Sequence, residues 1–160
     1  MSEINIREAA TEAEAPTVRR LFRDYAAWFE KTFQHDLCFQ GFEEELASLP
    51  GKYAPPAGNV WIADGAEGPV GIVAIRPLDA DICEMKRLWV AEAARGSGLG
   101  RRLIEASFAG ARAADYRRMR LDTIAGMEGA LALYREYGFR EIPPYCANPL
   151  PGVIYLELEF

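Results

Sequence analysis

The run Arg-Gly-Ser-Gly-Leu-Gly at positions 95–100 has the residue types that anion binding requires. An amphipathic stretch follows it and predicts a helix, whose first amide groups lack partners and carry partial positive charge. Glycines in front of those amides leave room for a phosphate, because they have no Cβ atoms. Arginines flank the run and add charge. We therefore predict a phosphate-binding loop that consists of Arg95, Gly96, Ser97, Gly98, Leu99, Gly100 and Arg101.

Two common phosphate-binding motifs do not fit this run. A Walker A loop needs a Lys-Ser or Lys-Thr pair after its last glycine, and Arg101-Arg102 stands there instead. A Rossmann loop fits better, since Asp122 lies about twenty residues further on. That motif begins directly after its strand, however, and here residues 91–95 intervene. The alternative is that the run is only a glycine-rich turn with solvated arginines and binds no ligand.

Composition narrows the range of partners. The net charge is −6, and binding to nucleic acid needs clustered Lys and Arg, so we expect no nucleic-acid partner. A cationic substrate is compatible with this charge. No apolar run approaches the roughly 20 residues that span a bilayer, so we expect no membrane partner.

The cysteines and the histidine predict neither a disulfide nor a metal site. Cys38, Cys83 and Cys146 are widely spaced and form no CxxC pair. His35 is the only histidine, which leaves both a metal site and a histidine-based nucleophilic mechanism without support. We expect a reduced, cytoplasmic protein with free thiols and no metal.

Hydrophobic periodicity predicts the elements that position the loop. Strands are predicted at 4–9, 60–63, 70–75, 82–90, 119–123, 139–142 and 153–160, and helices through 18–29, 42–49, 99–113 and 130–137. The first helix has two candidate starts, a Thr11–Glu14 capping box and Pro16 in a first helical position. In the helix after the loop, Leu99, Leu103, Ala106 and Ala113 are predicted to face inward.

The order of these elements is β-α-α-β-β-β-α-β-α-β-β. Short turns predict antiparallel hairpins in the first half, and the strand-helix-strand unit 82–123 predicts a parallel pair. We therefore expect an α/β (α+β) fold with a mixed central sheet of about seven strands and about four helices on its two faces. One domain, 1–160, accounts for the length. The last strand, 153–160, is expected to be exposed and could pair in a homodimer.

Three segments resemble the GNAT superfamily of N-acetyltransferases. Arg95-x-x-Gly98-x-Gly100 is similar to its Arg/Gln-x-x-Gly-x-Gly/Ala loop. The stretch CEMKRLWV at 83–90 is similar to the strand before that loop, and ALALYREYGF at 130–139 to the helix and strand near its C-terminus. Their order and spacing match the superfamily over residues 82–142, and the order of the elements extends the match to nearly the whole chain.

The resemblance implies a single-domain GNAT-like fold and an acetyl-coenzyme A-dependent N-acetyltransferase. Backbone groups of Leu88, Trp89 and Val90 would bind the pantetheine arm, and the loop 95–100 would bind the pyrophosphate. The implied reaction moves an acetyl group to a primary amine of a small molecule by direct attack, through a tetrahedral intermediate whose oxyanion needs a donor. Acetylation of a protein lysine or N-terminus, or a non-catalytic coenzyme A-binding sensor, are the alternatives.

Two proton transfers are implied for this reaction. An alkylamine is protonated at neutral pH, and Glu84 is our candidate base, directly or through water. A Glu84–Lys86 pair that covers the floor of the cleft is the alternative, because a charge inside a sheet is costly unless it is paired or faces water. Tyr134 matches the tyrosine that protonates the departing thiolate in the superfamily, and core packing is its alternative role.

The resemblance also indicates where the acceptor would bind. Specificity in the superfamily usually comes from the first two helices and from the loop between the last strands. The candidates for substrate binding are Tyr25, Trp28, Phe39 and Tyr145. Aromatic residues at helical spacing are also typical of a core, which is the alternative for the first of these segments. Glu43, Glu44 and Glu45 are predicted to form a solvated helix face.

Overall fold

The structure, a computed structural model, describes residues 3–37 and 41–160. These residues form one seven-stranded sheet in the order β1-β2-β3-β4-β5-β7-β6, together with four α-helices. The elements are β1 (Asn5–Glu8), α1 (Ala15–Phe33), α2 (Phe42–Ser48), β2 (Asn59–Gly65), β3 (Gly68–Asp79), β4 (Ile82–Val90), α3 (Leu99–Ala113), β5 (Arg118–Ile124), α4 (Glu128–Glu136), β6 (Arg140–Ile142) and β7 (Val153–Glu159). Short 3₁₀ turns occur at Gly51–Tyr53 and Glu92–Ala94.

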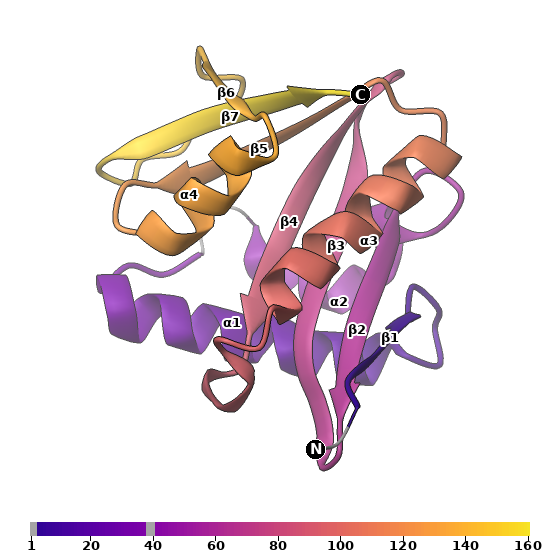
Figure 1. The fold of residues 1–160 in the computed structure, drawn as a ribbon. Coiled ribbons are helices and arrows are strands. Elements are labelled where there is room, and N and C mark those ends of the chain that lie inside the picture. Colours follow the sequence, from indigo (N-terminus) through magenta and orange to yellow (C-terminus); the bar gives the residue numbers. More distant parts are fainter. Residues whose placement is uncertain (1–2, 38–40) are drawn as a thin grey trace.

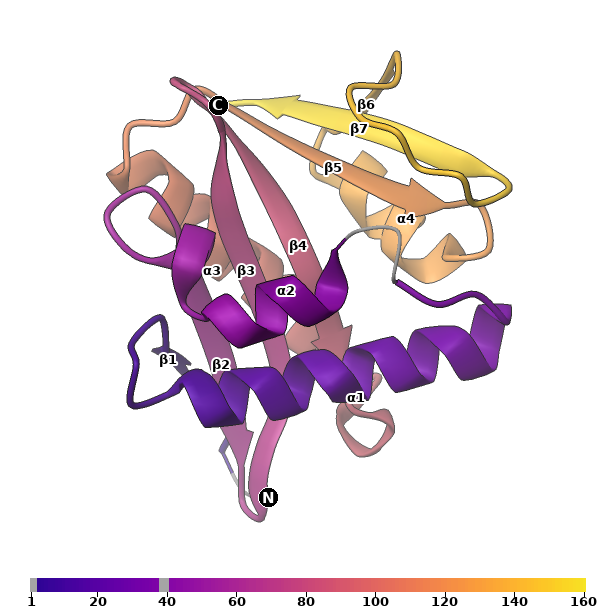
Figure 2. The same ribbon diagram turned by 180° about the vertical axis from the view of Figure 1, so that it is seen from behind.

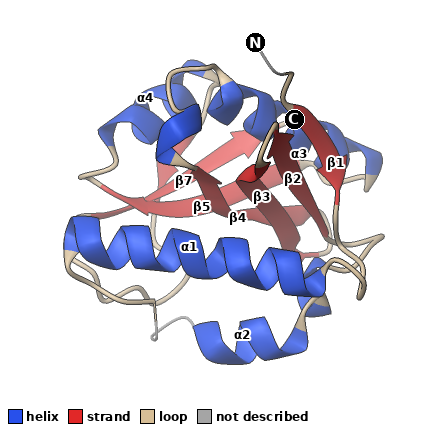
Figure 3. Ribbon diagram, turned by 90° about the horizontal axis from the view of Figure 1, so that it is seen from below, coloured by secondary structure: helices blue, strands red, loops and turns tan. Residues whose placement is uncertain are grey.

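The helices cover both faces of the sheet. Helices α3 and α4 lie on one face (Figure 1), and α1 and α2 lie on the other (Figure 2). Figure 3 shows the three layers edge-on, with α1 running across the strands. The predicted mixed sheet with helices on both faces is confirmed.

Strand pairing also follows the prediction with one exception. β1 to β4 pair antiparallel in sequence order, and β4 pairs parallel with β5 across the α3 connection. β7 pairs with β5 on one side and with β6 on the other. The expectation that the last strand forms an exposed edge is therefore wrong, because the short β6 occupies that edge over Tyr155–Glu157.

The start of α1 is set by its proline. The helix begins at Ala15 with Pro16 in its first turn and has no side-chain N-cap bond. The Thr11 hydroxyl accepts a hydrogen bond from the Glu14 amide at 3.3 Å, but in the turn before the helix. Of the two candidate starts, the one that places Pro16 in the first turn is correct, as expected for a residue that has no amide to donate.

The two faces of the sheet have separate cores. Leu99, Leu103 and Phe108 of α3 pack into one core, and Leu21 and Phe22 of α1 pack into the other. The inward stripe of α3 differs from the prediction in that Ala106 is only half-buried and Ala113 is exposed. Ile104 and Ser107, which the prediction did not include, are buried instead. No helix in residues 3–37 and 41–160 is long and apolar enough to cross a membrane.

Close packing of α3 on the sheet leads to a stability prediction. A Cβ atom at Gly110 would overlap the ring of Trp61. Gly110→Ala should therefore lower the free energy of unfolding by about 1–3 kcal/mol through overpacking. Gly129→Ala is the matched control, because a Cβ atom there meets open space and alanine favours helix by up to about 1 kcal/mol. Urea unfolding measures both, and an unchanged G110A midpoint contradicts the packing argument.

Candidate active site

β4 and β5 separate partway along their length. Their ladder covers only Ile82–Glu84 against Arg118–Arg120, and beyond it the strands diverge (Figure 1). A cavity of about 80 Å³ lies in the opening, between residues 85–88 of β4 and 121–124 of β5. Tyr134 of α4 and Tyr25 of α1 also line it. The opening leaves this part of β4 without a strand partner on the β5 side.

A bulge in β4 coincides with the opening. Ala74 of β3 pairs with Lys86 and Ile72 pairs with Trp89, so Val73 lies opposite both Arg87 and Leu88. Arg87 has φ 61°, a left-handed conformation that is unusual for a residue with a side chain. Bulges of this kind redirect side chains and interrupt pairing. The bulge thus sets the direction of the last three residues of β4, which are predicted to bind the pantetheine arm.

An ion pair spans the two diverging strands. Lys86 Nζ lies 3.6 Å from Asp122 Oδ1, and both side chains are 7% exposed. Each of the two residues lies two positions beyond the last ladder pair, Glu84 with Arg120. Burial acts to raise the pKa of Asp122, but the Lys86 ammonium and the Asn148 amide, which donates at 3.0 Å, hold it below its usual value. Asp122 is therefore ionised at neutral pH.

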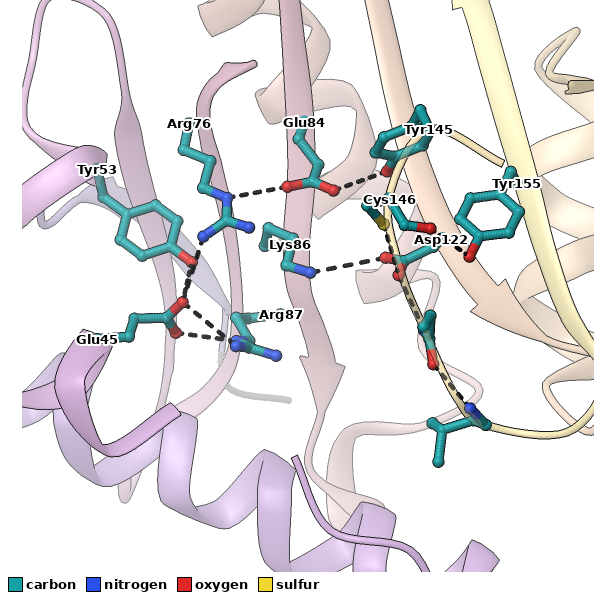
Figure 4. Close-up of polar contacts among 12 residues, drawn as sticks. Glu45, Tyr53, Arg76, Glu84, Lys86, Arg87, Asp122, Tyr145, Cys146 and Tyr155 are labelled. Atoms are coloured by element: carbon teal, nitrogen blue, oxygen red, sulfur yellow. Dashed lines mark hydrogen bonds and ion pairs between the residues drawn. The ribbon is translucent and has the colours of Figure 1, made fainter. Parts of the chain in front are cut away.

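Glu84 is held from both sides. The Arg76 Nε donates to its Oε1 at 2.9 Å, and the Tyr145 hydroxyl donates to its Oε2 at 2.7 Å. The Glu84 side chain is 3% exposed, and Figure 4 shows it between these two partners. Glu84 and Lys86 therefore have separate partners, and the alternative in which they pair with each other is wrong.

Glu45 of α2 belongs to the same polar cluster. Arg87 donates to it through Nε at 3.0 Å and Nη2 at 3.2 Å, and the Tyr53 hydroxyl donates at 3.0 Å. Its side chain is only 10% exposed. The prediction of a solvated face is therefore wrong for Glu45, although Glu43 and Glu44 are exposed. The bulge explains the difference, because it directs Arg87 toward α2.

A second pocket, of about 180 Å³, lies between the Lys86–Asp122 pair and residues 145–147 of the loop after β6. Its polar lining residues are Arg76, Glu84, Lys86, Asp122, Tyr145 and Cys146. Lys86 and Asp122 line this outer pocket and also the cavity between the strands. The two spaces are therefore neighbours, separated by one ion pair.

Tyr134 contributes a buried phenol to the cavity between the strands. Its side chain is 6% exposed, and burial raises the pKa of its phenol above the usual value, so it is protonated at neutral pH. Its hydroxyl makes no hydrogen bond with the residues that the structure describes. Thr123 lines the same cavity, and its Oγ1 is buried without a hydrogen-bond partner in the described part of the chain. Such unpaired groups are costly unless a ligand bonds them.

The glycine loop has the geometry of an anion cradle. Gly96 and Gly98 have φ 79° and 82°, and Gly98 is the N-cap of α3 with no side-chain cap bond. Cβ atoms added at Gly96, Gly98 or Gly100 would meet open space. The first amides of α3 are therefore uncapped and uncovered, which fits a pyrophosphate. Arg101, at the end of the predicted loop, donates through Nη2 to Glu136 Oε2 of α4 at 2.8 Å.

The structure distributes the predicted acceptor residues between two sites. Tyr145 lines the outer pocket and Tyr25 the cavity between the strands. Trp28 lies instead beside the glycine loop, with the Arg95 guanidinium 5.2 Å from its ring centre. Phe39 lies outside the described residues. The acceptor role of all four stays a prediction.

Metal chemistry receives no support from the described residues. They contain no group of three or more His, Cys, Asp or Glu side chains that could hold a metal ion. Cys83 and Cys146 are free thiols, and burial raises the pKa of Cys83 to about 12. Cys83 is therefore not a nucleophile at neutral pH.

Sequence comparison identifies the family. Residues 56–141 match the model of the acetyltransferase (GNAT) domain. The chain belongs to the GNAT acetyltransferases. It is 34% identical over 160 residues to an uncharacterized N-acetyltransferase of Schizosaccharomyces pombe, which covers 99% of this chain and 96% of that one. An uncharacterized N-acetyltransferase of Escherichia coli is 30% identical over 135 residues, which cover 82% of this chain and 80% of that protein.

Solved structures share the GNAT fold. An acyl-CoA N-acyltransferase from Klebsiella pneumoniae superposes with a TM-score of 0.73 at 27% identity, covering 99% of this chain and 97% of that chain. A GNAT family acetyltransferase from Elizabethkingia anophelis, with acetyl-CoA bound, superposes with a TM-score of 0.65 at 21% identity over 98% of both chains. The chain is therefore an acyl-CoA-dependent N-acyltransferase of the GNAT family.

Several residues of the site were missed by the sequence reading. Arg76 and Arg87 received no role there, Asp122 was considered only for the rejected Rossmann loop, and Glu45 was assigned to solvent. Asp122 carried a usable signal, since it is a charge inside a strand that had to be buried. Glu45 carried none, because only the bulge at Arg87 distinguishes it from its exposed neighbours.

The cradle geometry predicts the effect of one glycine substitution. Gly98→Ala forces alanine into φ 82° and adds a Cβ atom to the cradle, so acetyl-CoA should bind about tenfold or more weakly. Gly68→Ala is the matched control, because its φ is 128° and its Cβ atom also meets open space, but it lies in the β2–β3 turn. Titration calorimetry with acetyl-CoA measures both. Equal affinity losses in the two variants would mean that backbone strain alone is responsible.

Proposed function

We propose that this GNAT enzyme transfers an acetyl group from acetyl-CoA to the primary amine of a small molecule. The observation that carries the proposal is the pair of neighbouring spaces divided by Lys86 and Asp122. A donor in the opening between β4 and β5 and an acceptor in the outer pocket would meet at that division. The outer pocket is small compared with the roughly 300–1,000 Å³ of drug-sized sites, which favours a small acceptor.

The donor would be held by the loop and by the end of β4. We assign the pyrophosphate to the amides of residues 96–100, with Arg95 and Arg101 nearby, and the pantetheine arm to the backbone of Leu88, Trp89 and Val90. Acetyl-CoA supplies an activated carbonyl and a thiolate leaving group. Thr123, with its unpaired Oγ1, is an additional donor or acceptor along that path.

Glu84 is the base in this proposal. Both of its oxygens are already bonded, so a water in the outer pocket would relay the proton from the acceptor ammonium to it. The freed amine then attacks the carbonyl, an N–C bond forms and the C–S bond breaks. Asp122 is the second candidate, because it borders both spaces, although its low pKa makes it a weaker base.

Tyr134 is the acid. It lines the cavity and keeps its proton at neutral pH, so it can protonate the departing sulfur. The ammonium loses two protons in all. One goes to Glu84 and then to solvent, and the other replaces the proton that Tyr134 gives up. The charge and proton balance of the amide product and free thiol is thereby complete.

A turnover assay tests this function directly. Acetyl-CoA and a panel of small amines are incubated with the enzyme, and thiol release and acetylated products are measured by absorbance and mass spectrometry. Glu84→Gln should lower kcat/KM by about two orders of magnitude, as loss of a general base does. If Asp122→Asn lowers kcat/KM by that much and E84Q does not, Asp122 is the base.

The other readings have distinct outcomes in the same assay. Acetylation of lysine peptides alone would identify a protein acetyltransferase. Tight acetyl-CoA binding with no product from either panel would identify a sensor. We further propose a reducing compartment such as the cytoplasm, which the free thiols favour. Size-exclusion chromatography tests whether the protein forms a homodimer.

A further inference from the structure

The charges around the outer pocket are buried and balanced. Its lining contributes two cations, Arg76 and Lys86, and two carboxylates, Glu84 and Asp122. The partners behind them are also balanced, since Glu45 bonds Arg87 and lies 3.6 Å from Arg76. Figure 4 shows Arg76 between Glu45 and Glu84, and Lys86 beside Asp122. The cluster is therefore neutral as a whole.

This neutrality restricts the charge of a ligand that can be buried there. Glu84, Lys86 and Asp122 have side chains 3%, 7% and 7% exposed, so water screens them weakly. An acceptor that carries only an ammonium group would leave one uncompensated charge in this setting, which is costly. An acceptor with one positive and one negative group adds no net charge and can exchange partners with the existing pairs.

The positions of the pairs give such an acceptor a direction. The amine must lie toward the donor, and Asp122 is the carboxylate that borders both spaces. Its pair with Lys86 is long, at 3.6 Å, so its Oδ1 can accept a second cation. An ammonium at this point would face the opening between β4 and β5.

The opposite end of the pocket suits a carboxylate. Arg76 bonds Glu84 through Nε and approaches Glu45 through Nη1, and no other carboxylate of the described residues lies within ion-pair distance of it. Guanidinium has five N–H donors, so the Nη2 group is available. The Arg76 side chain is 25% exposed, more than the other charges of the pocket, so a ligand can reach it.

We propose that the acceptor is a small zwitterionic amino acid, with its ammonium at Asp122 and its carboxylate at Arg76. This inference rests on the proposed acetylation of small amines and narrows it to one class. Arg76 is then the residue that sets specificity, and it does so through the carboxylate of the acceptor rather than through the transferred group. A peptide lysine, whose flanking groups are neutral amides, lacks the second charge.

Matched acceptors test the proposal in the wild-type enzyme. Leucine, methionine and phenylalanine are each compared with their amides, which keep the size and the amine and lose the negative charge. We expect kcat/KM to be at least about tenfold higher for each amino acid, and R76Q should bring the ratio toward one. Equal or faster acetylation of the amides overturns the proposal while leaving acetylation of small amines intact.

Binding without the donor is the second readout. In the absence of acetyl-CoA, the amino acids should raise the midpoint of thermal unfolding and their amides should not. Arg76→Lys, which keeps a charge, should retain part of that shift if R76Q perturbs folding. Amino-acid binding without acetylation supports the zwitterion site and contradicts the proposed reaction. Acetylation of lysine peptides alone, with no amino-acid binding, overturns both.

Discussion

Tyr134→Phe is expected to lower kcat by about two to three orders of magnitude, the usual contribution of a general acid. The phenol lines the cavity between β4 and β5, and its raised pKa keeps it protonated. Phenylalanine keeps the ring and its contact with Phe139, 5.6 Å away between centres, and removes only the hydroxyl group that would donate the proton. Acetyl-CoA affinity should therefore stay within about twofold. Stopped-flow turnover and calorimetry measure the two quantities separately.

Tyr137→Phe is the matched control, because Tyr137 is the C-cap residue of the helix that contains Tyr134. The Tyr137 hydroxyl donates to Glu105 at 2.8 Å on the exposed side, away from the cavity, so kcat should be unchanged. Equal turnover by Y134F and wild type would show that Tyr134 only packs. A parallel loss of acetyl-CoA affinity in Y134F would indicate a binding role instead.

Glu45→Ala should cause the largest loss of stability, about 3 kcal/mol. The substitution removes the carboxylate that Arg87 bonds through two nitrogens and that accepts the Tyr53 hydroxyl. The Arg87 side chain is 2% exposed, so water cannot replace that carboxylate at low cost. A loss of this size lowers the unfolding midpoint by about 6–12 °C in a domain of this length.

Glu43→Ala provides the comparison within α2. Glu43 pairs with Arg23 at 3.2 Å, and the side chains are 69% and 53% exposed. Exposed pairs of this kind contribute about 0–1 kcal/mol, so E43A should behave almost as wild type. Urea unfolding monitored by tryptophan fluorescence gives both values. Equal losses of unfolding free energy in the two variants would show that burial does not make the Glu45–Arg87 pair more stabilising than an exposed pair.

The fold was predictable because its elements depend on local patterns. The strand 82–90 and the helix after the loop have clear periodicity, and Gly98 marks the N-cap between them. The order and direction of β1 to β5 follow from short turns and one crossover, which is expected to be right-handed. The edge at β6 was not predictable, because a three-residue strand carries too little pattern to reveal what it covers.

The proposed acceptor site was predictable only in part. Glu84 and Tyr145 were identified as candidates, and the structure places their side chains in contact. Their partners depend on register, since Arg76 faces Glu84 through strand pairing and Asp122 faces Lys86 across diverging strands. Register is a tertiary property that a single sequence does not encode in any local spacing.

The bulge at Arg87 has a consequence for building hybrid enzymes. Between the Arg76–Glu84 and Ile72–Trp89 pairs, β4 has one residue more than β3. This extra residue separates the half of the strand that we propose for the acceptor from the half that we propose for the donor. Deleting a residue there would turn the donor half over and present its opposite side to the coenzyme. Exchange of acceptor specificity between relatives should therefore place its junctions outside residues 84–89, so that the length of this stretch is inherited whole.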